Sequence, residues 1–418
     1  MIIDKPLPLP ELDPAARELA DSRGQRIGIL IVAYNAAGTL GRVLGRIRPE
    51  VWNNVEEVVV FDDASQDSTY QLAVGHQTLA GMRKLKVIQN RRNLGYGGNQ
   101  KAGYRYFLDK GLDLVVLLHG DGQYAPEVLA HLYHPLVTGE ADAVFGSRMM
   151  PAYGGPLKGG MPLYKYAGNR ILTFLENRAL QMSLTEFHSG YRAYSLHALG
   201  QIDFSMMTDD FHFDTQIIIK LRHQGFRISE TPIPTFYGEE ICYVNGLRYA
   251  RDILGSVWRY RQAAWGGRSC PEFREYFVED PPGVSRYSSP YYLRRLAGAE
   301  QEVLDLGRPG AGDELAGRKY DRILVMDALE RAAQPERLLR DCLGALKRRG
   351  QIVVWLPANR GRFTPQAAGR LLAENGYEIV WRLGTVGRAR PLGFLATLWP
   401  GRFGQEQILV ARPQRRPE

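Results

Sequence analysis

The chain is poor in cysteine and has no long apolar run. Its 418 residues include 3 cysteines, Cys242, Cys270 and Cys342, which lie far apart. An odd number of widely spaced cysteines argues against a disulfide framework and matches no zinc-binding spacing. No stretch reaches the 18 or more apolar residues that a membrane span requires. These absences favour a cytoplasmic protein without a transmembrane segment.

The first residues also lack the features of a secretory signal. Met1 to Asp21 is rich in proline and acidic residues, without an apolar centre next to basic residues, so no signal peptide is expected. The net charge of +8 favours anionic lipid or nucleic acid as a partner. No nucleic-acid-binding motif accompanies that charge, so we expect no nucleic-acid partner. Nothing in the sequence specifies an oligomeric state.

Short apolar runs alternate with helical patterns in the first half of the chain. Strands are predicted at 27–32, 58–61, 85–88 and 115–118, and a fifth run covers 143–147. Alternating strands and helices predict a parallel sheet with right-handed crossovers. Each of the first four runs ends in a polar or glycine-rich loop. Because ligands of open α/β sheets bind at the carboxyl ends of the strands, these loops are expected to share one cleft.

The fourth run leads into an acidic loop between glycines, His119-Gly120-Asp121-Gly122-Gln123. Mg²⁺ and Mn²⁺ prefer one or two carboxylates together with substrate phosphates. Asp121 and the amide oxygen of Gln123 meet that need. A turn aspartate without a ligand is the alternative, and this segment alone does not decide between them.

The ordered set of loops resembles the GT-A glycosyltransferases of family 2, and within them the dolichol- and polyprenyl-phosphate sugar synthases. The resemblance covers about Gly24 to Arg261. It rests on Ala33-Tyr34-Asn35, Asp62-Asp63-x-Ser65-x-Asp67-x-Thr69, Asn93-x-Gly95, Asp121-Gly122-Gln123, Gly146-Ser147-Arg148, Ser189-Gly190-Tyr191-Arg192 and Phe213-Asp214. The resemblance implies a metal-dependent, inverting enzyme that moves a sugar from a nucleotide sugar to a polyprenyl phosphate.

The same resemblance implies roles for individual residues on the donor side. Asp63 would accept hydrogen bonds from the base or ribose, with an Asx-turn cap as the alternative role. Asp121 would act in catalysis by holding Mg²⁺ or Mn²⁺ on the diphosphate, with Gln123 beside it. The implied donor-binding residues are Ala33, Tyr34, Asn35, Asp63, Asn93, Gly95 and Asp121.

Two positions depart from the family pattern. His119 stands where an aspartate is usual, and imidazole is a poorer partner for Mg²⁺ than carboxylate. His119 is therefore expected to bind the metal weakly, favour Mn²⁺ or hydrogen-bond a phosphate, and a packed histidine at a strand end is the alternative. Ala36 stands where many relatives carry glutamate, so the identity of the donor does not carry over.

Basic residues after the fifth run predict the acceptor side, since arginine forks and lysine charges suit phosphate. The resemblance places Arg148 and the segment from Lys165 to Arg170 near the acceptor phosphate, and Arg192 follows in a motif. Solvated surface charge is the alternative for Arg148 and Lys165. The glycine- and proline-rich loop 151–160 is expected to act as a lid.

A phosphate acceptor is already ionised at neutral pH, whereas a hydroxyl acceptor would need a general base. Asp210 is the candidate base for a saccharide or other hydroxyl acceptor, which is the alternative function. At least one of Asp209, Asp210 and Asp214 is also expected to cap a helix over 215–223. A non-catalytic scaffold that binds nucleotide is a further alternative.

The segment 248–261 combines apolar residues at helical spacing with several arginines and Trp258. Such a helix suits a membrane interface, and packing on its own domain is equally compatible with the pattern. We therefore expect a cytoplasmic protein, with a peripheral position at the inner face of the membrane left open.

The rest of the chain predicts a linker and a second, smaller α/β domain. Residues 303–412 resemble a class I S-adenosylmethionine methyltransferase, but only a few residues separate Gly312 from Asp321, too few for a βαβ unit of about 30 residues. Pro309 also removes a backbone donor from the glycine-rich loop. We expect a truncated Rossmann-like domain that does not bind S-adenosylmethionine. The predicted organisation is a lead at 1–24, a GT-A domain at 25–263, a linker at 264–300 and the methyltransferase-like domain at 301–413.

Overall fold

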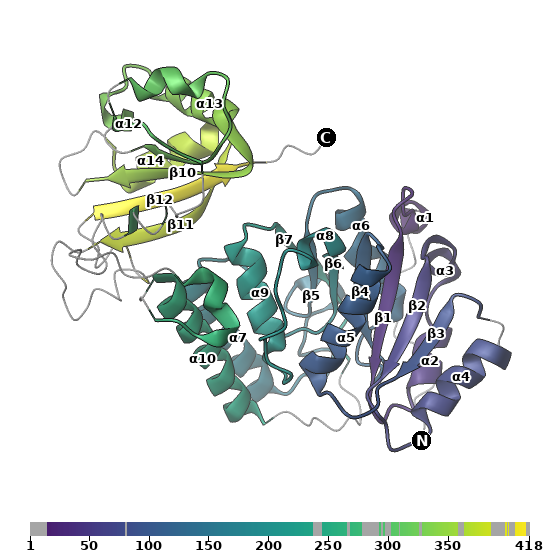
Figure 1. The fold of residues 1–418 in the computed structure, drawn as a ribbon. Coiled ribbons are helices and arrows are strands. Elements are labelled where there is room, and N and C mark those ends of the chain that lie inside the picture. The colour runs from purple at the N-terminus through teal and green to yellow at the C-terminus, as the bar shows by residue number, and fades with distance from the viewer. Residues whose placement is uncertain are drawn as a thin grey trace. The chain divides into compact units, whose positions relative to one another are not determined.

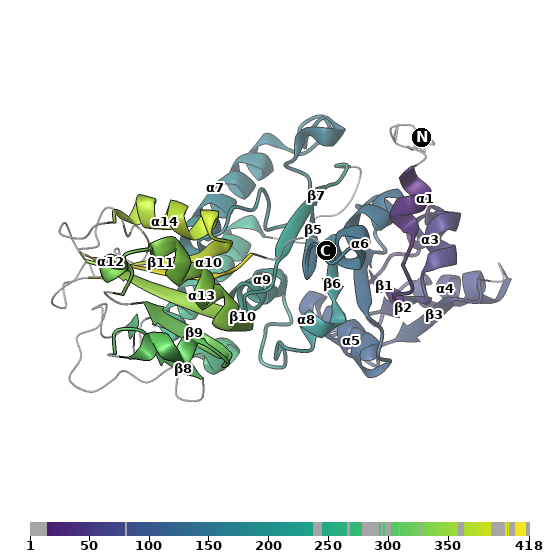
Figure 2. The ribbon, with the colours of Figure 1, turned by 90° about the horizontal axis from the view of Figure 1, so that it is seen from above.

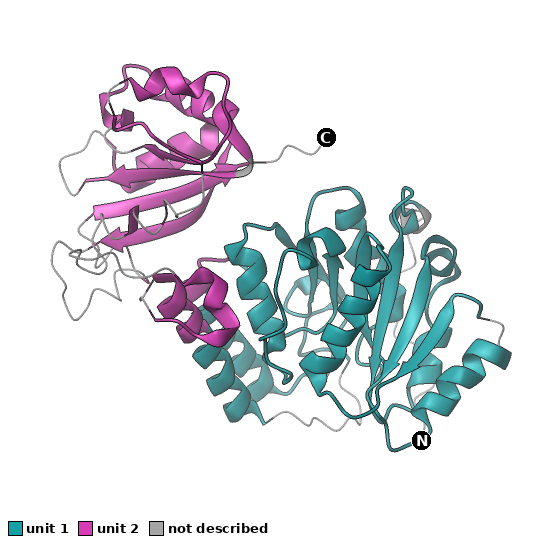
Figure 3. Cartoon of the chain, in the orientation of Figure 1, with its two compact units in different colours: residues 1–177, 183–256 teal, residues 178–182, 257–418 magenta. Residues whose placement is uncertain are grey.

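The computed structural model forms two compact units, which Figure 3 shows in different colours. The first comprises Met1–Asn177 and Ser183–Ser256, and the second Arg178–Met182 and Val257–Glu418. The structure describes residues 15–79, 82–236, 245–265, 268–277, 292–293, 296, 302–308, 310–325, 328–357, 363–385, 398, 400 and 406–414. Most of the predicted lead at 1–24 and most of the predicted linker at 264–300 lie outside the described residues, as does Cys242.

The first unit is built on a seven-stranded sheet in the order β3-β2-β1-β4-β6-β5-β7. β6 is antiparallel to both of its neighbours, while the other strand pairs are parallel. The predicted Rossmann-like, mostly parallel sheet is thereby confirmed (Figure 1). The strands are β1 (Ile27–Ala33), β2 (Glu57–Asp62), β3 (Leu85–Gln89), β4 (Leu114–His119), β5 (Ala143–Ser147), β6 (Arg192–Ser195) and β7 (Ile228–Pro232).

Helices cover both faces of this sheet, which explains the continuous apolar runs in its central strands. Figure 2 shows α5 and α8 on one side and α1 and α6 on the other. Gly28 in β1 allows the close approach of α5, because a Cβ there would lie 2.3 Å from the Phe107 ring. The helices of the first half are α1 (Ala15–Ala20), α2 (Leu40–Gly45), α3 (Pro49–Asn54), α4 (Thr69–Leu79), α5 (Tyr96–Asp109) and α6 (Leu129–Val137).

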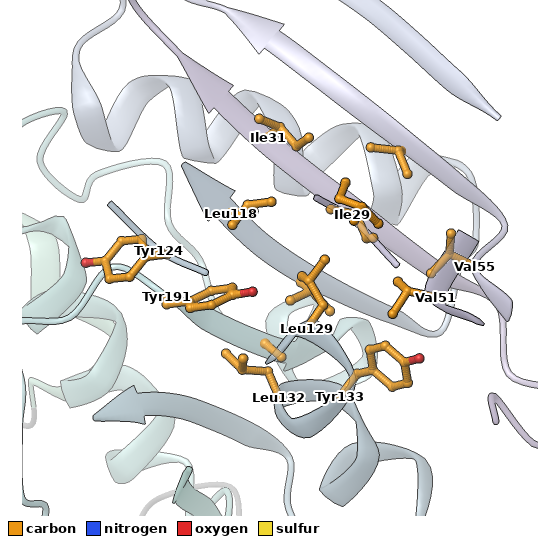
Figure 4. Close-up of a cluster of buried hydrophobic side chains, with 14 of the residues drawn as sticks. Ile29, Ile31, Val51, Val55, Leu118, Tyr124, Leu129, Leu132, Tyr133 and Tyr191 are labelled. Atoms are coloured by element: carbon orange, nitrogen blue, oxygen red, sulfur yellow. The ribbon is translucent and has the colours of Figure 1, made fainter. Parts of the chain in front are cut away.

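The core of the first unit lies between β1, β4 and α6 (Figure 4). Ile29 and Ile31 are alternate residues of β1 and point to the same face, as the period of a strand requires. Leu129 and Leu132 of α6 pack against that face, and all four side chains are buried. This packing fixes β1 and β4 and thereby the loops that follow them.

The later helices follow β5 in the chain, and the last residues of α7 and α10 belong to the second unit. They are α7 (Leu163–Leu180), α8 (Leu196–Leu199), α9 (Phe213–His223) and α10 (Gly246–Trp265), and the short η2 (Pro151–Tyr153) lies in the predicted lid loop.

The prediction that an aspartate caps the helix over 215–223 was wrong. α9 begins at Phe213, His212 occupies its N-cap position, and no side chain caps it. Asp214 therefore lies inside the helix, where it is buried.

The second unit has a five-stranded sheet in the order β11-β12-β10-β9-β8. β8, β9 and β10 are parallel, and β12 runs antiparallel between β10 and β11. The strands are β8 (Val303–Asp305), β9 (Tyr320–Val325), β10 (Leu346–Leu356), β11 (Tyr377–Thr385) and β12 (Glu406–Pro413), and the helices are α12 (Ala328–Arg331), α13 (Pro335–Ala345) and α14 (Pro365–Glu374).

An aromatic cluster supports the second unit at Trp381 of β11. The Trp381 ring lies 6.5 Å from the ring of Tyr260 and 5.8 Å from that of Trp265. The Gln181 side chain donates from Nε2 to the carbonyl of Arg382 and accepts the N–H of the same residue. It therefore satisfies both backbone groups of Arg382 in β11, as a paired strand would. Within the described part of the chain, no helix has both the length and the apolar character needed to span a bilayer.

Candidate functional site

The predicted cleft residues follow the carboxyl ends of β1, β2 and β4, which lie side by side in the sheet. The N–H of Asp63 donates to the carbonyl of Ala33 at 2.8 Å, and the N–H of Gly120 donates to that of Val32 at 2.9 Å. These bonds continue the ladder beyond the strands. The loops after β1, β2 and β4 therefore start from one edge, as the sequence predicts.

The loop after β1 is held by side chains of the loop after β2. The backbone N–H groups of residues 35–37 donate in turn to Ser65 Oγ, Thr69 Oγ1 and Asp67 Oδ2, at 2.9, 2.8 and 3.1 Å. Burial raises the pKa of Asp67, but the hydrogen bonds from Thr69 and from the backbone outweigh it and leave the pKa lowered. The Ser-x-Asp-x-Thr motif thus shapes the loop after β1.

The exposed end of that loop presents Tyr34 and Asn35. The side chain of Tyr34 is 48% exposed and is available to a ligand. Asn35 adopts a left-handed φ of 50°, and its Oδ1 accepts the N–H of Gln66 at 2.8 Å. A short polar side chain that bonds locally makes this backbone conformation accessible. Ala33 is buried beneath the loop.

Asp63 organises the loop that follows β3. Its carboxylate accepts hydrogen bonds from Asn90 Nδ2, from the N–H of Leu94 and from the N–H of Gly95, at 2.8, 2.8 and 3.0 Å. Asn93 Oδ1 also accepts the N–H of Gly95 at 2.9 Å. The structure therefore joins three of the predicted donor residues, with Asp63, only 3% exposed, beneath the loop.

Two glycines of that loop lie against the segment before α9. Gly95 has a left-handed φ of 79°, and a Cβ there would lie 2.8 Å from the carbonyl oxygen of Asp209. A Cβ on Gly97 would lie 2.6 Å from the carbonyl oxygen of Thr208. The N–H of Gly97 donates to the carbonyl of Asp209 at 2.7 Å. The glycines thus allow two backbone segments to meet.

The acidic loop after β4 presents Asp121 at the cleft edge. Asp121 Oδ1 accepts the N–H of Gln123 at 3.0 Å, and among the described residues Oδ2 accepts no hydrogen bond. Gly122 has a left-handed φ of 80°, and Thr39 Oγ1 donates to the carbonyl of Gly120 at 2.7 Å. A half-exposed carboxylate on a fixed turn, with an amide side chain two residues on, suits a divalent cation.

His119 is packed among aromatic side chains. Its ring centroid lies 5.7 Å from that of Tyr96 and 5.1 Å from that of Tyr124. Nε2 is buried without a hydrogen-bond partner, and a Cβ on Gly190 would lie 2.8 Å from it. Burial lowers the pKa of His119, although Asp121 and Asp214 oppose that shift. This nitrogen faces Gly190, so a metal contact would have to come from Nδ1.

Arg192 lies in a buried polar network, and its guanidinium donates to backbone carbonyls. Its guanidinium donates to the carbonyls of Ser189, Asp214 and Phe187 at 2.8, 3.0 and 2.7 Å, and the residue is 1% exposed. Burial lowers its pKa, but the Asp214 carboxylate and nearby tyrosines more than reverse the shift, so the pKa is raised. Arg192 therefore joins β6 to α9 instead of facing the cleft.

Arg148 forms an ion pair with the buried Glu186. Its backbone N–H donates to Glu186 Oε2 at 2.7 Å, and its Nε donates to Oε1 at 3.0 Å, with Nη2 also donating to Oε1. Asn169 Nδ2 donates to the same oxygen at 2.8 Å, and Arg148 Nη2 reaches the carbonyl of His188 at 3.1 Å. Burial raises the pKa of Glu186, but Arg148 outweighs it and holds that pKa below its usual value.

Lys165 and Arg170 lie on α7, on either side of Asn169. Lys165 is half-buried and Arg170 is exposed. Arg170 therefore faces away from Asn169, whose side chain turns inward to Glu186. The structure brings Arg148 and α7 together, but not Arg170 and Arg148.

Asp210 lies in a small polar cluster before α9. Ligand atoms of Asp210, His212 and Asp252 lie within 4.8 Å of one another, and all three residues are half-buried. Arg248 already contacts both carboxylates, with Nη2 at 3.5 Å from Asp210 and Nε at 3.6 Å from Asp252. The cluster has the composition of a cation site, and the Arg248 guanidinium already supplies positive charge to both of its carboxylates.

Sequence reasoning missed Glu186, Asn169 and Tyr96. Tyr96 donates from its hydroxyl to Asp214 Oδ2 at 2.7 Å, and its ring lies between those of His119 and Phe211. Tyr96 follows Gly95 of one motif directly, and Glu186 lies three residues before Ser189 of another, so proximity to a motif was the available signal. Asn169 lies within the predicted segment from Lys165 to Arg170, but its contact with Glu186 depends on how α7 faces the sheet.

Comparison with known proteins gives one family and several relatives. Residues 28–202 match the model of glycosyl transferase family 2. The chain is 32% identical over 220 residues to the undecaprenyl-phosphate mannosyltransferase of Micrococcus luteus, which covers 52% of this chain and 85% of the relative. It is 29% identical over 221 residues to the polyprenol monophosphomannose synthase of Mycolicibacterium smegmatis, covering 52% and 79% of the two chains.

A third relative carries a different sugar in its name. The UDP-N-acetylglucosamine–dolichyl-phosphate N-acetylglucosaminyltransferase of Methanococcus voltae is 26% identical over 224 residues, covering 51% of this chain and 86% of the relative. Each of these matches covers about half of this chain.

Proposed function

The chain belongs to glycosyl transferase family 2, and from that premise we propose that it transfers a sugar from a nucleotide sugar to a polyprenyl phosphate. It is a glycosyltransferase with a GT-A, Rossmann-like first unit, and inversion at the sugar is typical of its family. The observation that carries the proposed acceptor is the Arg148–Glu186 pair at the carboxyl end of β5. The printed names of the three relatives support the same class of acceptor.

On the donor side, we propose that Tyr34 and the 35–37 loop contact the nucleotide. Asp63 would act mainly by holding the loop of Asn93 and Gly95 in place, because its oxygens are already used by that loop. The sequence predicts a direct contact between Asp63 and the base or ribose. Such a contact would require one of these hydrogen bonds to be shared.

Asp121 and Gln123 would hold Mg²⁺ or Mn²⁺, with His119 as a further ligand only through Nδ1. The half-exposed Asp121 carboxylate fits a divalent cation, whereas the buried Nε2 of His119 does not. When bound, the ion neutralises charge that develops on the diphosphate as the sugar leaves. Asp121 would act in catalysis by holding the ion beside the leaving diphosphate.

On the acceptor side, Arg148 would orient the phosphate whose oxygen attacks the anomeric carbon. The new bond forms between that oxygen and the carbon, while the bond to the nucleotide diphosphate breaks on the opposite face. A prenyl phosphate is already ionised, so no side chain needs to remove a proton. A hydroxyl acceptor would need a base, and for that second candidate Asp210 is the residue to test.

Proposals for the second unit follow from its sheet. β8 is the edge strand among the described residues, and no strand there occupies the position expected to present an acid to the ribose of S-adenosylmethionine. Pro309 of the glycine-rich loop lies outside the described residues. We propose that the whole protein works at the inner face of the membrane. We further propose that its second unit is a methyltransferase-like docking or packing module that does not bind S-adenosylmethionine. Calorimetry with the full chain tests this: micromolar binding of S-adenosylmethionine would overturn it.

The decisive test of function is a donor and acceptor screen. Nucleotide sugars are incubated with the protein in Mn²⁺ or Mg²⁺, with and without undecaprenyl phosphate, and products are separated by mass. Sugar transfer that depends on both metal and undecaprenyl phosphate is expected. Transfer to a soluble saccharide alone would favour the hydroxyl acceptor. Nucleotide binding without any turnover would favour a scaffold.

A further inference from the structure

α7 is amphipathic with its apolar side turned outward. The outer face of α7 is defined here by Leu163, Tyr164, Arg170, Ile171, Phe174 and Leu175, which recur at the spacing of one helix side. The five apolar members are 70%, 74%, 60%, 65% and 40% exposed, in chain order. Scattered exposed apolar residues are normal on a surface, but a continuous stripe marks an interaction site.

The inner side of α7 is polar. Thr173 and Glu176 are 4% and 0% exposed, and Thr173 Oγ1 donates to Asn169 at 3.2 Å. Glu176 Oε1 accepts from Thr215 Oγ1 at 3.1 Å, and its Oε2 lies 3.1 Å from His188 Nε2. A water-facing helix has the opposite arrangement, with its polar residues outside. The sequence of α7 therefore suits an apolar surrounding on its outer face.

The charged residues around the outer face of α7 indicate which kind of partner it binds. Arg170 lies within the apolar stripe, and the only acidic residue of α7 is Glu176, which is buried on the other side. α10 adds exposed Leu247 and Leu254, and Arg248 and Arg251 lie between these leucines in the sequence. The two arginines contact Asp252, and their side chains remain 68% and 75% exposed. Apolar and aromatic side chains mixed with arginine are typical of helices that lie in a membrane interface with anionic lipid.

We propose that the outer face of α7, with the exposed N-terminal part of α10, docks on an anionic lipid bilayer. This inference rests on the proposed function and adds the surface by which the enzyme reaches its acceptor. α7 and α10 are tied together through His188, because Tyr249 of α10 lies 3.4 Å from His188 Nδ1 and Glu176 of α7 pairs with Nε2. The two helices can therefore dock as one surface.

Docking of α7 on the bilayer would also bring Arg148 close to the lipid phosphates. Asn169 on the inner side donates to Glu186, and Glu186 holds Arg148. A helix with its side chains is about 10 Å thick. An α7 helix lying in the interface thus keeps Arg148 about one helix diameter from the lipid phosphates, within reach of an acceptor whose tail stays in the bilayer.

Vesicle flotation of the full chain tests the docking surface. The double variant Ile171→Ser/Phe174→Ser removes two exposed apolar side chains, and Leu79→Ser, at a position 91% exposed on α4, is the matched control. Wild type and Leu79→Ser should float with phosphatidylglycerol vesicles at low salt, and the double variant should bind about tenfold or more weakly. Arg170→Gln should weaken binding less and reduce its dependence on salt. Equal flotation of the double variant and wild type would overturn the proposal.

Two further readouts distinguish a membrane-docking face from a dimer interface and from a failure of the proposed function. If the outer face instead packs on a second copy, light scattering will show a wild-type dimer that the double variant loses, without vesicle binding, and this would overturn the proposal. Transfer to a short-chain, detergent-soluble prenyl phosphate should be unchanged in the double variant, while transfer to undecaprenyl phosphate in vesicles falls. A wild type that floats but never transfers to prenyl phosphate would contradict the proposed function and leave the docking surface intact.

Discussion

The proposed donor and acceptor sides of the first unit hold their polar groups by different means. On the donor side, Asp63 and Asp67 accept hydrogen bonds from backbone N–H groups of neighbouring loops. On the proposed acceptor side, Arg148 forms an ion pair with the buried Glu186, which lies 38 residues away in the sequence. The proposed donor side is thus held by hydrogen bonds between loops, and the proposed acceptor side by a buried ion pair.

This difference has consequences for substitution. A loop held by several backbone hydrogen bonds loses one contact at a time, each worth about 0.5–1.5 kcal/mol. A buried ion pair that loses one partner leaves an uncompensated charge, at a cost of about 3–5 kcal/mol. Changes on the acceptor side should therefore affect folding and activity together, and each such variant needs its melting temperature measured alongside its rate.

The largest effect is expected for Asp121→Asn. The neutral amide cannot hold a divalent cation against the diphosphate, and a loss of several kcal/mol of charge stabilisation corresponds to a rate about 10³-fold lower or more. The half-exposed side chain should leave the melting temperature nearly unchanged. Steady-state transfer rates across a Mn²⁺ and Mg²⁺ titration check this. Wild-type activity in EDTA, or full activity of the variant at saturating donor, would refute the assignment.

The next effect separates the two sides. Arg148→Ala should leave nucleotide-sugar affinity within about threefold of wild type while transfer to polyprenyl phosphate falls by about 100-fold, because charge-assisted hydrogen bonds contribute about 1.5–3 kcal/mol each. Calorimetry with the donor and a transfer assay measure the two quantities.

A paired variant controls for the charge that Arg148→Ala leaves behind. Arg148→Ala/Glu186→Gln removes the buried uncompensated carboxylate and should recover most of the lost melting temperature without recovering transfer. If the double variant regains activity together with stability, the loss in the single variant came from misfolding and Arg148 has no acceptor role.

A smaller effect is expected for Asp63→Asn on the donor side. One of its oxygens becomes an amide that cannot accept the N–H of Leu94 or Gly95, so the loop after β3 loosens. Donor affinity should fall by about tenfold, which corresponds to about 1.4 kcal/mol. Turnover at saturating donor should change little. A much larger loss of donor affinity would favour a direct contact between Asp63 and the nucleotide.

The smallest effect concerns pH. Glu186 has a pKa held below its ordinary value of 4.5 in the folded protein. The stability it contributes is therefore complete above about pH 4.5 and is lost as the pH falls through the lower folded-state value. Wild type should lose more stability in that acid window than Glu186→Gln, in denaturant titrations at a series of pH values. Parallel curves for the two proteins would exclude this contribution.

The contrast between the two sides also explains what the sequence could predict. The apolar runs predict β1 to β5 within one or two residues, and parallel order then places the donor loops at one edge. The motif around Asp63 and Asp67 is local, so its residues are found together in the sequence and in the fold. The position of Asp121 follows for the same reason.

The acceptor side was less predictable because it depends on tertiary packing. Arg192 has the residue type of a phosphate ligand, yet burial turns its guanidinium to backbone carbonyls. The start of α9 at Phe213 brings Asp214 into the helix and next to Tyr96. The polar inner side of α7 cannot be distinguished from an ordinary outer side until the facing of the helix is known.

The central claim is that a prenyl phosphate receives the sugar. The most direct test is to incubate wild-type protein with its donor and undecaprenyl phosphate in Mn²⁺, extract the lipid and determine the new linkage by mass spectrometry and phosphorus NMR. A phosphodiester between lipid and sugar, with the anomeric configuration inverted relative to the donor, is predicted. Sugar found only as the free hydrolysis product or on a hydroxyl group would contradict the account.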